Sequence, residues 1–307
     1  MMINEQQTQM LTALAQGLSF GMRTPIMRTP EEYGLEYEEV SFETQDGVTI
    51  KGWFMPADSN PVEPNKVIIS NHFSPANRYG FAGHLEGLDF SGGFEVNFLP
   101  RYKALHDAGY NVLAYDLRSH GESGEGENSV SGVGYYEWQE VLASIDYIKN
   151  RPDTVTSDIS LYSQCMGANA TFNAIEKDPE AFNDIKCMVA VAPLKGRTTI
   201  ERNCEQMQIP VEEGVEAFEP IYNGFTGLHV ADHNIIPKAA NVNIPIFYFQ
   251  VRDDMNSRWT DVQEMYDLTP VEDKKIEYME GTPLRFKGYN YFSDHPKAMI
   301  EWFDAHN

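Results

Sequence analysis

A segment near the middle of the chain, residues 159–175, constrains the fold more than any other. Residues 159–162 are largely apolar and typical of a short buried strand, which stops at Ser163. Small residues, with apolar residues at helical spacing among them, follow at once over residues 168–175. The segment therefore predicts a strand that turns sharply into a helix.

Cys165 lies at the apex of this turn, with Ser163 two residues before it and Gly167 two residues after it. The spacing is that of the Gly-x-Ser-x-Gly nucleophile elbow, with Ser in the first Gly position and Cys as the nucleophile. Because the N-terminus of the following helix favours a thiolate, the pattern predicts a nucleophilic cysteine exposed at the carboxyl edge of a sheet. The alternative is a cysteine buried in the core, which is the commoner role of a free cysteine.

The charge of the chain narrows its candidate partners. The 307 residues include 46 Asp and Glu against 23 Lys and Arg, which gives a net charge of −23. Such a charge repels nucleic acid and anionic lipid, so neither is expected as a partner. The apolar run near the N-terminus is broken at Gln16 and Gly17 and follows no basic region, which predicts neither a signal peptide nor a membrane span.

Cysteine usage indicates a reducing environment. Cys165, Cys187 and Cys204 are odd in number and widely spaced, which predicts neither a disulfide framework nor a zinc site. A reducing compartment follows, and we expect a cytoplasmic protein. No glycine-rich dinucleotide loop follows a strand, so no cofactor and no metal are expected.

Strands alternate with helices along the chain, which predicts one α/β domain with a modest insertion. An antiparallel hairpin is expected over residues 37–55, with its turn at 45–47. Further strands are expected at 66–70, 111–115, 187–191, 244–249 and 275–279, and helices at 97–107, 138–148, 259–268 and 296–305. The segment 280–293 is predicted to be a loop.

The pattern also predicts a division of the chain. Residues 1–36 are expected to form an N-terminal helical extension. Residues 198–237, where the pattern weakens, are expected to form a small cap insertion. Residues 37–197 and 238–307 then make up the core.

The order of elements, with the elbow at Cys165, an acid after a late strand and a histidine near the end, resembles the α/β-hydrolase fold. Residues 116–124, Asp-Leu-Arg-Ser-His-Gly-Glu-Ser-Gly, are similar to the loop after a central strand in many of these hydrolases. Cysteine at the apex resembles the dienelactone-hydrolase-like branch, whose members cleave small esters and lactones. The tail, residues 285–296, resembles an uncharacterised bacterial subgroup of the superfamily. The resemblance implies an α/β protein with a mostly parallel central sheet, an antiparallel N-terminal hairpin and a small helical cap.

The resemblance also implies a Cys-His-Asp catalytic triad. It places Asp253 at the acid position, with Asp254 as the near alternative. The other interpretation of either residue is a solvated loop carboxylate or a cap for the next helix. Of the eight histidines, His295 lies after the last predicted strand in the chain order that the resemblance implies, at the start of the final helix, which makes it the candidate base; the other interpretation is a structural histidine. In the superfamily this histidine usually follows the strand by a few residues, where this chain has Gly-Thr-Pro-Leu-Arg at 281–285.

The remaining parts of the site are implied by position. The resemblance suggests the backbone N–H groups of Met166 and Phe73 as the oxyanion hole. His72, Tyr79 and Tyr291 are candidates for contact with a substrate, or else for ordering the long loops by hydrogen bonding and packing. A separate interpretation makes Asp116 and Arg118 an ion pair that braces their loop.

These observations predict a hydrolase that cleaves a small ester, lactone or thioester through an acyl-enzyme on Cys165. One alternative is a catalytically silent binding protein with a hydrolase fold, in which the thiol would react no faster than free cysteine. Another is an acyltransferase or cyclase that uses the same cysteine, because both share the acylation step. A second copy of the chain is also a candidate partner.

Overall fold

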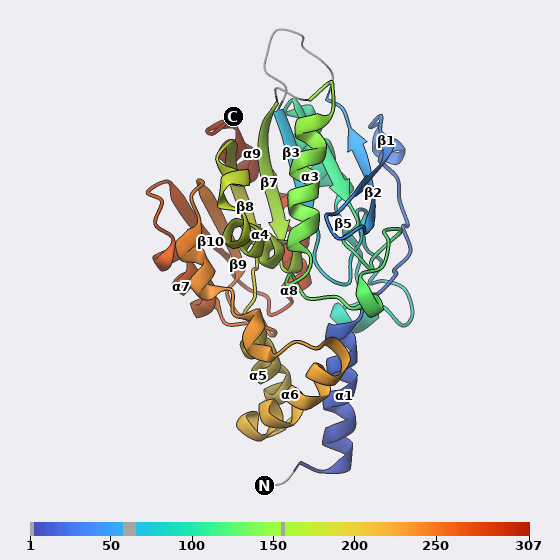
Figure 1. Cartoon of the computed structure of the whole chain (residues 1–307), viewed down its shortest axis with the longest axis vertical. Coiled ribbons are helices and arrows are strands. Elements are labelled where there is room, and N and C mark those ends of the chain that lie inside the picture. Colours follow the sequence, from blue (N-terminus) through green and yellow to red (C-terminus); the bar gives the residue numbers. More distant parts are fainter. Residues whose placement is uncertain (1–2, 58–65, 155–156) are drawn as a thin grey trace.

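The computed structural model describes residues 3–57, 66–154 and 157–307, and its centre is an eight-stranded sheet in the order β1-β2-β6-β3-β7-β8-β9-β10 (Figure 1). The strands are β1 (Glu38–Glu43), β2 (Thr49–Met55), β3 (Lys66–Asn71), β6 (Tyr110–Tyr115), β7 (Asp158–Gln164), β8 (Ile185–Val191), β9 (Ile246–Val251) and β10 (Lys274–Met279), while β4 (Gly80–Phe81) pairs with β5 (Val96–Asn97) outside this sheet. From β6 to β10 all neighbours are parallel, whereas β2 is antiparallel to both β1 and β6. The mostly parallel sheet with an antiparallel N-terminal hairpin is therefore confirmed.

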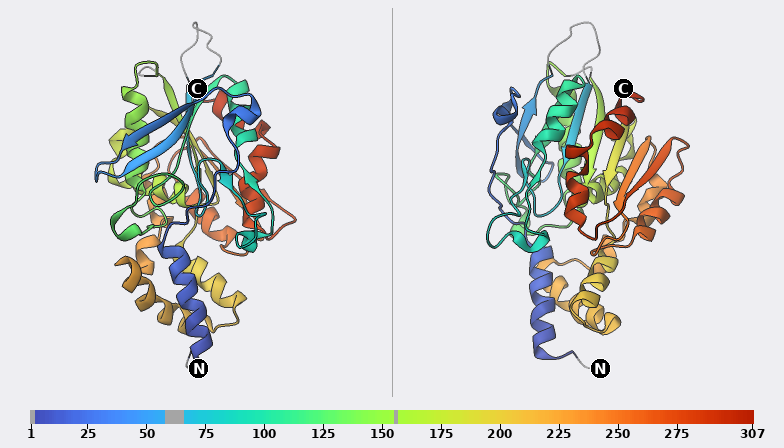
Figure 2. Two further views of the ribbon diagram at one scale, coloured as in Figure 1. Left: turned by 90° about the vertical axis from the view of Figure 1, so that its right-hand side faces the viewer. Right: turned by 180° about the vertical axis from the view of Figure 1, so that it is seen from behind.

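Helices cover both faces of the sheet, which explains why its inner strands are almost continuously apolar. One face packs against α3 (Trp138–Asn150), α4 (Met166–Lys177) and α7 (Trp259–Leu268), and the other against α2 (Leu99–Asp107), α8 (Arg285–Asp294) and α9 (Lys297–Asp304). The second group faces the viewer in the right-hand view of Figure 2. None of the helices in the described ranges combines the length and the apolar surface that crossing a bilayer requires.

The segment 280–293 is a correction to the sequence prediction, because most of it is helical rather than a loop. Tyr289 and Phe292 of α8 are buried, as is Arg285 at its first turn, so one face of the helix packs on the protein. Gly288 allows a close approach to β9, since a Cβ there would lie 2.7 Å from Cγ2 of Val251. Tertiary packing thus stabilises a helix that the glycine and aromatic residues do not favour locally.

A separate helical layer lies beyond the carboxyl ends of the parallel strands (Figure 1). It contains α1 (Glu5–Ser19), α5 (Gly196–Gln206) and α6 (Val211–Thr226), which share a hydrophobic cluster of their own. The Ser131 N–H donates to the Ser19 carbonyl at 2.8 Å and fastens α1 to the loop after β6. The N-terminal helix and the insertion after β8, which are far apart in the sequence, therefore form one layer.

His233 links the stability of this layer to pH. Its Nε2 lies 2.8 Å from the Tyr222 hydroxyl, and burial lowers the pKa of His233 to about 4. An unfolded chain takes up a proton near pH 6.5, which the folded chain does not accept until about pH 4. We therefore expect His233 to contribute stability above pH 6.5 and to lose it progressively as the pH falls toward 4.

The measurement is the free energy of unfolding in urea at pH 7 and pH 5, for the wild type and His233→Gln. Between these pH values the wild type should lose about 2 kcal/mol more than the variant. The same pH dependence in both proteins would contradict the assignment.

Candidate active site

Cys165 lies in a strained backbone conformation between β7 and α4. Its φ of 49° and ψ of −108° are sparsely populated by residues other than glycine, and such strain costs about 1–3 kcal/mol. Two hydrogen bonds hold the turn: the Cys165 N–H donates to Val191 O at 2.8 Å, and the Gly167 N–H donates to His72 O at 3.1 Å. The predicted strand, sharp turn and helix are all present.

Gly167 is required because the elbow packs tightly on the end of β3. A Cβ at this position would lie 2.5 Å from the carbonyl oxygen of Asn71, which is backbone and has little room to move. The Asn71 amide also donates to the Ser163 hydroxyl at 2.8 Å. Small side chains at both flanks of Cys165 thus let two chain segments meet.

Cys165 is almost enclosed, with an exposed fraction of only 6% for the residue. This corrects the prediction of an exposed side chain at the sheet edge. The sulfur belongs to the hydrophobic cluster on the α2–α8–α9 face, and Arg285 and Tyr289 of α8 interact with it electrostatically. Tyr289 of α8, which the sequence pattern did not place there, therefore packs in the same cluster as Cys165.

Two backbone donors are available beside the thiol. Met166 is the first residue of α4, so its N–H has no acceptor within the helix. Among the described residues, neither this N–H nor that of Phe73 donates a hydrogen bond. Both groups predicted for an oxyanion hole are thus unpaired.

Of the two neighbouring carboxylates after β9, only Asp254 points into the protein. Asp253 is exposed, whereas Asp254 is 2% exposed. The Asp254 carboxylate accepts hydrogen bonds from the Ser257 hydroxyl at 2.7 Å and the Gln250 amide at 3.0 Å. It also pairs with the guanidinium of Arg285.

Arg285 is the centre of the buried cluster. Besides Asp254, its guanidinium donates to the Ser257 hydroxyl at 3.0 Å, to the Tyr289 hydroxyl at 2.5 Å and to the Ala192 carbonyl. Burial alone would lower the pKa of Arg285, but the charge of Asp254 above all, together with interactions with Tyr289 and Cys165, outweighs burial and raises it. The side chain therefore carries a permanent positive charge beside the thiol.

Tyr289 connects this cation to Cys165. Burial raises the pKa of the Tyr289 hydroxyl well above its usual value, and interaction with the Cys165 thiol raises it further despite Arg285. The hydroxyl therefore stays protonated and can donate a hydrogen bond to the sulfur. Its ring stacks on Phe73 at a centroid distance of 3.9 Å, which fixes the orientation of the phenol.

Comparisons with known proteins agree with this architecture. A family model described as serine aminopeptidase, S33, matches residues 97–211. An esterase of Pyrococcus furiosus, Pf2001, superposes with a TM-score of 0.66 at 22% identity, covering 93% of this chain and 95% of the esterase. The chain has the α/β-hydrolase fold.

Two relatives by sequence extend the comparison. The uncharacterized protein YfhR of Salmonella typhimurium is 27% identical over 88% of this chain and 82% of its own length. A thiohydrolase of Eupenicillium brefeldianum is 25% identical over 52% of this chain and 44% of its own length.

The structure does not bring His295 to the elbow. His295 is exposed at the C-terminal end of α8, and its ring packs on Tyr291 at a centroid distance of 5.0 Å. Helix α8 begins beside the thiol with Arg285 and carries His295 about 15 Å away from that residue. A triad of Cys165, His295 and Asp253 stays a prediction, and no contact among the described residues joins its members.

Arg285 was the residue whose role the sequence analysis missed. In the α/β-hydrolase fold the histidine follows the last strand by a few residues, and Arg285 stands at that place after β10. The signal was present in the sequence as an arginine where an imidazole was expected. Its pairing with Asp254, however, depends on how α8 docks.

The three side chains predicted to contact a substrate are instead hydrogen-bonded to, or packed against, other parts of the protein. His72 accepts a hydrogen bond from the Leu117 N–H at its Nε2, so its Nδ1 carries the proton and donates to the Phe73 carbonyl at 2.8 Å. Burial lowers the pKa of His72 to about 3, which keeps the ring neutral. The Tyr79 hydroxyl donates to Glu95, and the Tyr291 ring stacks on Phe249 at 4.6 Å.

The ion pair predicted between Asp116 and Arg118 is wrong. Asp116 pairs instead with Arg78, whose Nη1 lies 2.6 Å from the carboxylate. Arg118 turns to the opposite side and pairs with Glu140 at 2.6 Å and Asp46 at 2.8 Å. Adjacent side chains along this loop face different parts of the protein, so neighbours in sequence do not meet.

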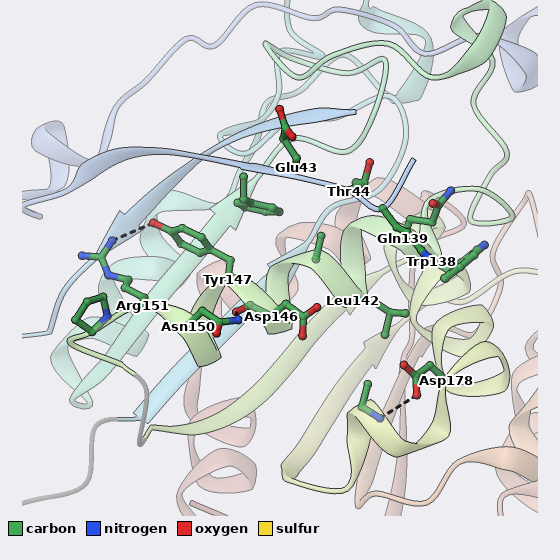
Figure 3. A pocket seen from close by; sticks show the side chains of 15 residues that line it. Glu43, Thr44, Trp138, Gln139, Leu142, Asp146, Tyr147, Asn150, Arg151 and Asp178 are labelled. Carbon is green, nitrogen blue, oxygen red and sulfur yellow. Dashed lines mark hydrogen bonds between the residues drawn. The ribbon is translucent and has the colours of Figure 1, made fainter. Parts of the chain in front are cut away.

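The largest cavity described here is distant from this chemistry. It has a volume of about 730 Å³ and lies between the end of β1 and α3, lined by residues that include Trp138, Asp146 and Tyr147 (Figure 3). Its lining includes none of the residues around the thiol, so we assign it no catalytic role. No group of three or more metal-ligating side chains occurs in the described part of the chain.

A much smaller apolar cavity, of about 20 Å³, lies where the helical layer meets the core. Val133 and Leu194 line it. The Asn169 amide donates to the carbonyl oxygens of both, and the Asn169 N–H donates to Cys165 O at 2.8 Å. Asn169 therefore links the wall of this cavity to the elbow by hydrogen bonds.

The close approach at Gly167 generates a stability prediction. We expect Gly167→Ala to lower the free energy of unfolding by about 1–3 kcal/mol, because the added methyl group overlaps the Asn71 carbonyl. Urea unfolding followed by circular dichroism measures the loss. Gly224→Ala in α6 is the matched control: a Cβ there meets nothing within 4 Å, so stability should rise by about 1 kcal/mol. An equal effect at both glycines would contradict the proposed crowding of the elbow.

Proposed function

We propose that the protein is an acyl hydrolase that cleaves a small ester, lactone or thioester through a covalent intermediate on Cys165. The observation that carries the proposal is the strained elbow at Cys165, together with the unpaired N–H groups of Met166 and Phe73 in the adjoining chain segments. Backbone strain of this kind persists where the surrounding structure holds it, and it concentrates at functional sites.

The proposed reaction has two steps. The Cys165 sulfur attacks the acyl carbon, and the oxyanion of the tetrahedral intermediate accepts hydrogen bonds from Met166 and Phe73 N–H. One donor of this kind typically contributes about 10²–10³ in rate. The leaving group then departs, and water releases the acid from the acyl-enzyme.

The comparisons support hydrolysis in general. The structural neighbour is named an esterase and one relative is named a thiohydrolase. Membership of the dienelactone-hydrolase-like branch and a cytoplasmic location stay predictions from the sequence.

A catalytically silent binding protein is the second candidate. The exposed position of His295 and the 6% exposure of the thiol favour it. In that case Cys165 would react with iodoacetamide at pH 7 no faster than free cysteine does.

The test of the proposal is Cys165→Ala. This variant should lose turnover of p-nitrophenyl butyrate by on the order of 10³-fold or more, because no acyl-enzyme forms without the sulfur. Release of p-nitrophenol and the butyryl adduct in intact-protein mass spectrometry report on the two steps. Cys204→Ala is the control, because this second buried thiol lies in α5, and its turnover should match the wild type. Unchanged turnover in Cys165→Ala would overturn the proposal.

A further inference from the structure

The buried cluster around Cys165 contains a cation where an α/β-hydrolase site is expected to hold an acid–base imidazole. Arg285 and Tyr289 are 3% and 1% exposed, and Arg285 joins Asp254 on one side and the Tyr289 hydroxyl on the other. A chain of hydrogen bonds therefore runs from the Asp254 carboxylate through the guanidinium to the phenol. Tyr289 lies at the elbow, because the Gln164 amide donates to its carbonyl at 3.1 Å and its side chain shares a hydrophobic cluster with Cys165.

Three buried histidines make hydrogen bonds to groups outside this cluster. Both ring nitrogens of His72 are bonded to backbone groups. His120 contacts the Ser74 hydroxyl at 2.9 Å and the Arg118 carbonyl at 2.8 Å, and His233 contacts Tyr222. Within the described ranges, no histidine has a recorded contact with Cys165, Arg285 or Tyr289.

This difference changes which protons the site can move. A guanidinium is not deprotonated in proteins, so Arg285 cannot take a proton from an attacking nucleophile. The Tyr289 phenol is a poor acid, because burial and the thiol raise its pKa. What the cluster can do is face a Cys165 thiolate with a positive charge and a hydroxyl donor.

The leaving group then decides which substrate reacts. An alkoxide is a strong base and usually departs with a proton from a general acid, a contribution of about 10²–10⁴ in rate. A thiolate is the conjugate base of a group whose pKa is about 8.5, so it departs without one. A site with a nucleophile and oxyanion donors, but no imidazole, is therefore matched to thioesters.

We propose that Arg285 and Tyr289 take the place of the acid–base histidine and restrict Cys165 to acyl donors whose leaving group departs without a proton, which among the proposed ester, lactone and thioester substrates selects thioesters. This inference rests on the proposed function and names its substrate class. The Cys165 thiolate, its proton lost to solvent, forms a carbon–sulfur bond to the acyl carbon. The carbonyl π electrons move to oxygen, return on collapse, and break the bond to the leaving thiolate.

Release of the acyl group follows the same logic. Water must lose a proton as it attacks, and neither Arg285 nor Tyr289 accepts one. A second thiolate needs no base, attacks the acyl carbon and expels the Cys165 thiolate. Water therefore releases the acyl group slowly, and a thiol acceptor releases it faster.

The first experiment compares three butyryl donors on the wild-type protein: the p-nitrophenyl ester, the ethyl thioester and the ethyl ester. Intact-protein mass spectrometry follows the butyryl adduct on Cys165, with Cys165→Ala as the blank. We expect the p-nitrophenyl ester and the thioester to acylate the protein, the ethyl ester to react slower by about 100-fold or more, and added N-acetylcysteamine to remove the adduct.

The outcomes separate the two proposals. Acylation by the ethyl ester within about tenfold of the thioester rate overturns the thioester inference and leaves the proposed function standing. No adduct from any of the three donors overturns both.

The second experiment changes the cation itself. Arg285→His places an imidazole beside Asp254 and should raise ethyl butyrate turnover by about tenfold or more, with a new ionisation near neutral pH in the rate profile. Arg285→Lys keeps the charge without adding a base and should show neither change. If Arg285→His has the same ethyl ester rate and the same pH profile as the wild type, the role assigned to Arg285 is overturned.

Tyr289→Phe tests the positioning role with a smaller change. Removing the hydroxyl should slow acylation by the thioester by about tenfold, with the pH profile of acylation displaced upward, because the thiolate loses a hydrogen-bond donor. Urea unfolding confirms that each variant is folded before rates are compared. An unchanged rate and profile in folded Tyr289→Phe would overturn the role of the hydroxyl.

Discussion

The ion pair between Asp254 and Arg285 is the interaction on which the arrangement of this site depends. Both side chains are buried, at 2% and 3% exposure, where an unpaired charge would be costly. Removing one member of such a pair typically costs about 3–5 kcal/mol, since the other charge is left without compensation. The pair therefore holds the loop after β9 and the start of α8 in one relative position.

Further hydrogen bonds extend this constraint to the nucleophile. Through the Ala192 carbonyl, Arg285 reaches the chain just after β8, beside the Val191 carbonyl that holds the Cys165 N–H. Through Tyr289 it reaches the aromatic ring of Phe73, whose N–H is one of the two candidate oxyanion donors. One guanidinium thus contacts the chain after β8 and the aromatic side of the candidate site.

The site separates two functions that a catalytic histidine would combine. Stabilisation of an oxyanion needs only backbone N–H groups, and the elbow supplies these whatever lies beyond the thiol. Proton transfer needs a group that titrates near neutral pH, and no such group contacts the cluster in the described residues. The α/β-hydrolase fold therefore retains the elbow while the chemistry beyond it changes.

The sequence by itself determined the features that depend on local pattern. The apolar run to Ser163, the small residues around Cys165 and the helical spacing after it predicted the elbow, and continuous apolar strands predicted a sheet covered on both faces. Only the tertiary structure decided which side chains meet at the thiol. Arg285 lies 31 residues from Asp254 and 93 from Ala192 in the chain, so their contacts depend on how α8 docks against β8 and β9. The same limit explains why the partner predicted for Arg118 is wrong. Buried ion pairs form between segments that are distant in the chain, and such pairs produce no periodic pattern in the sequence.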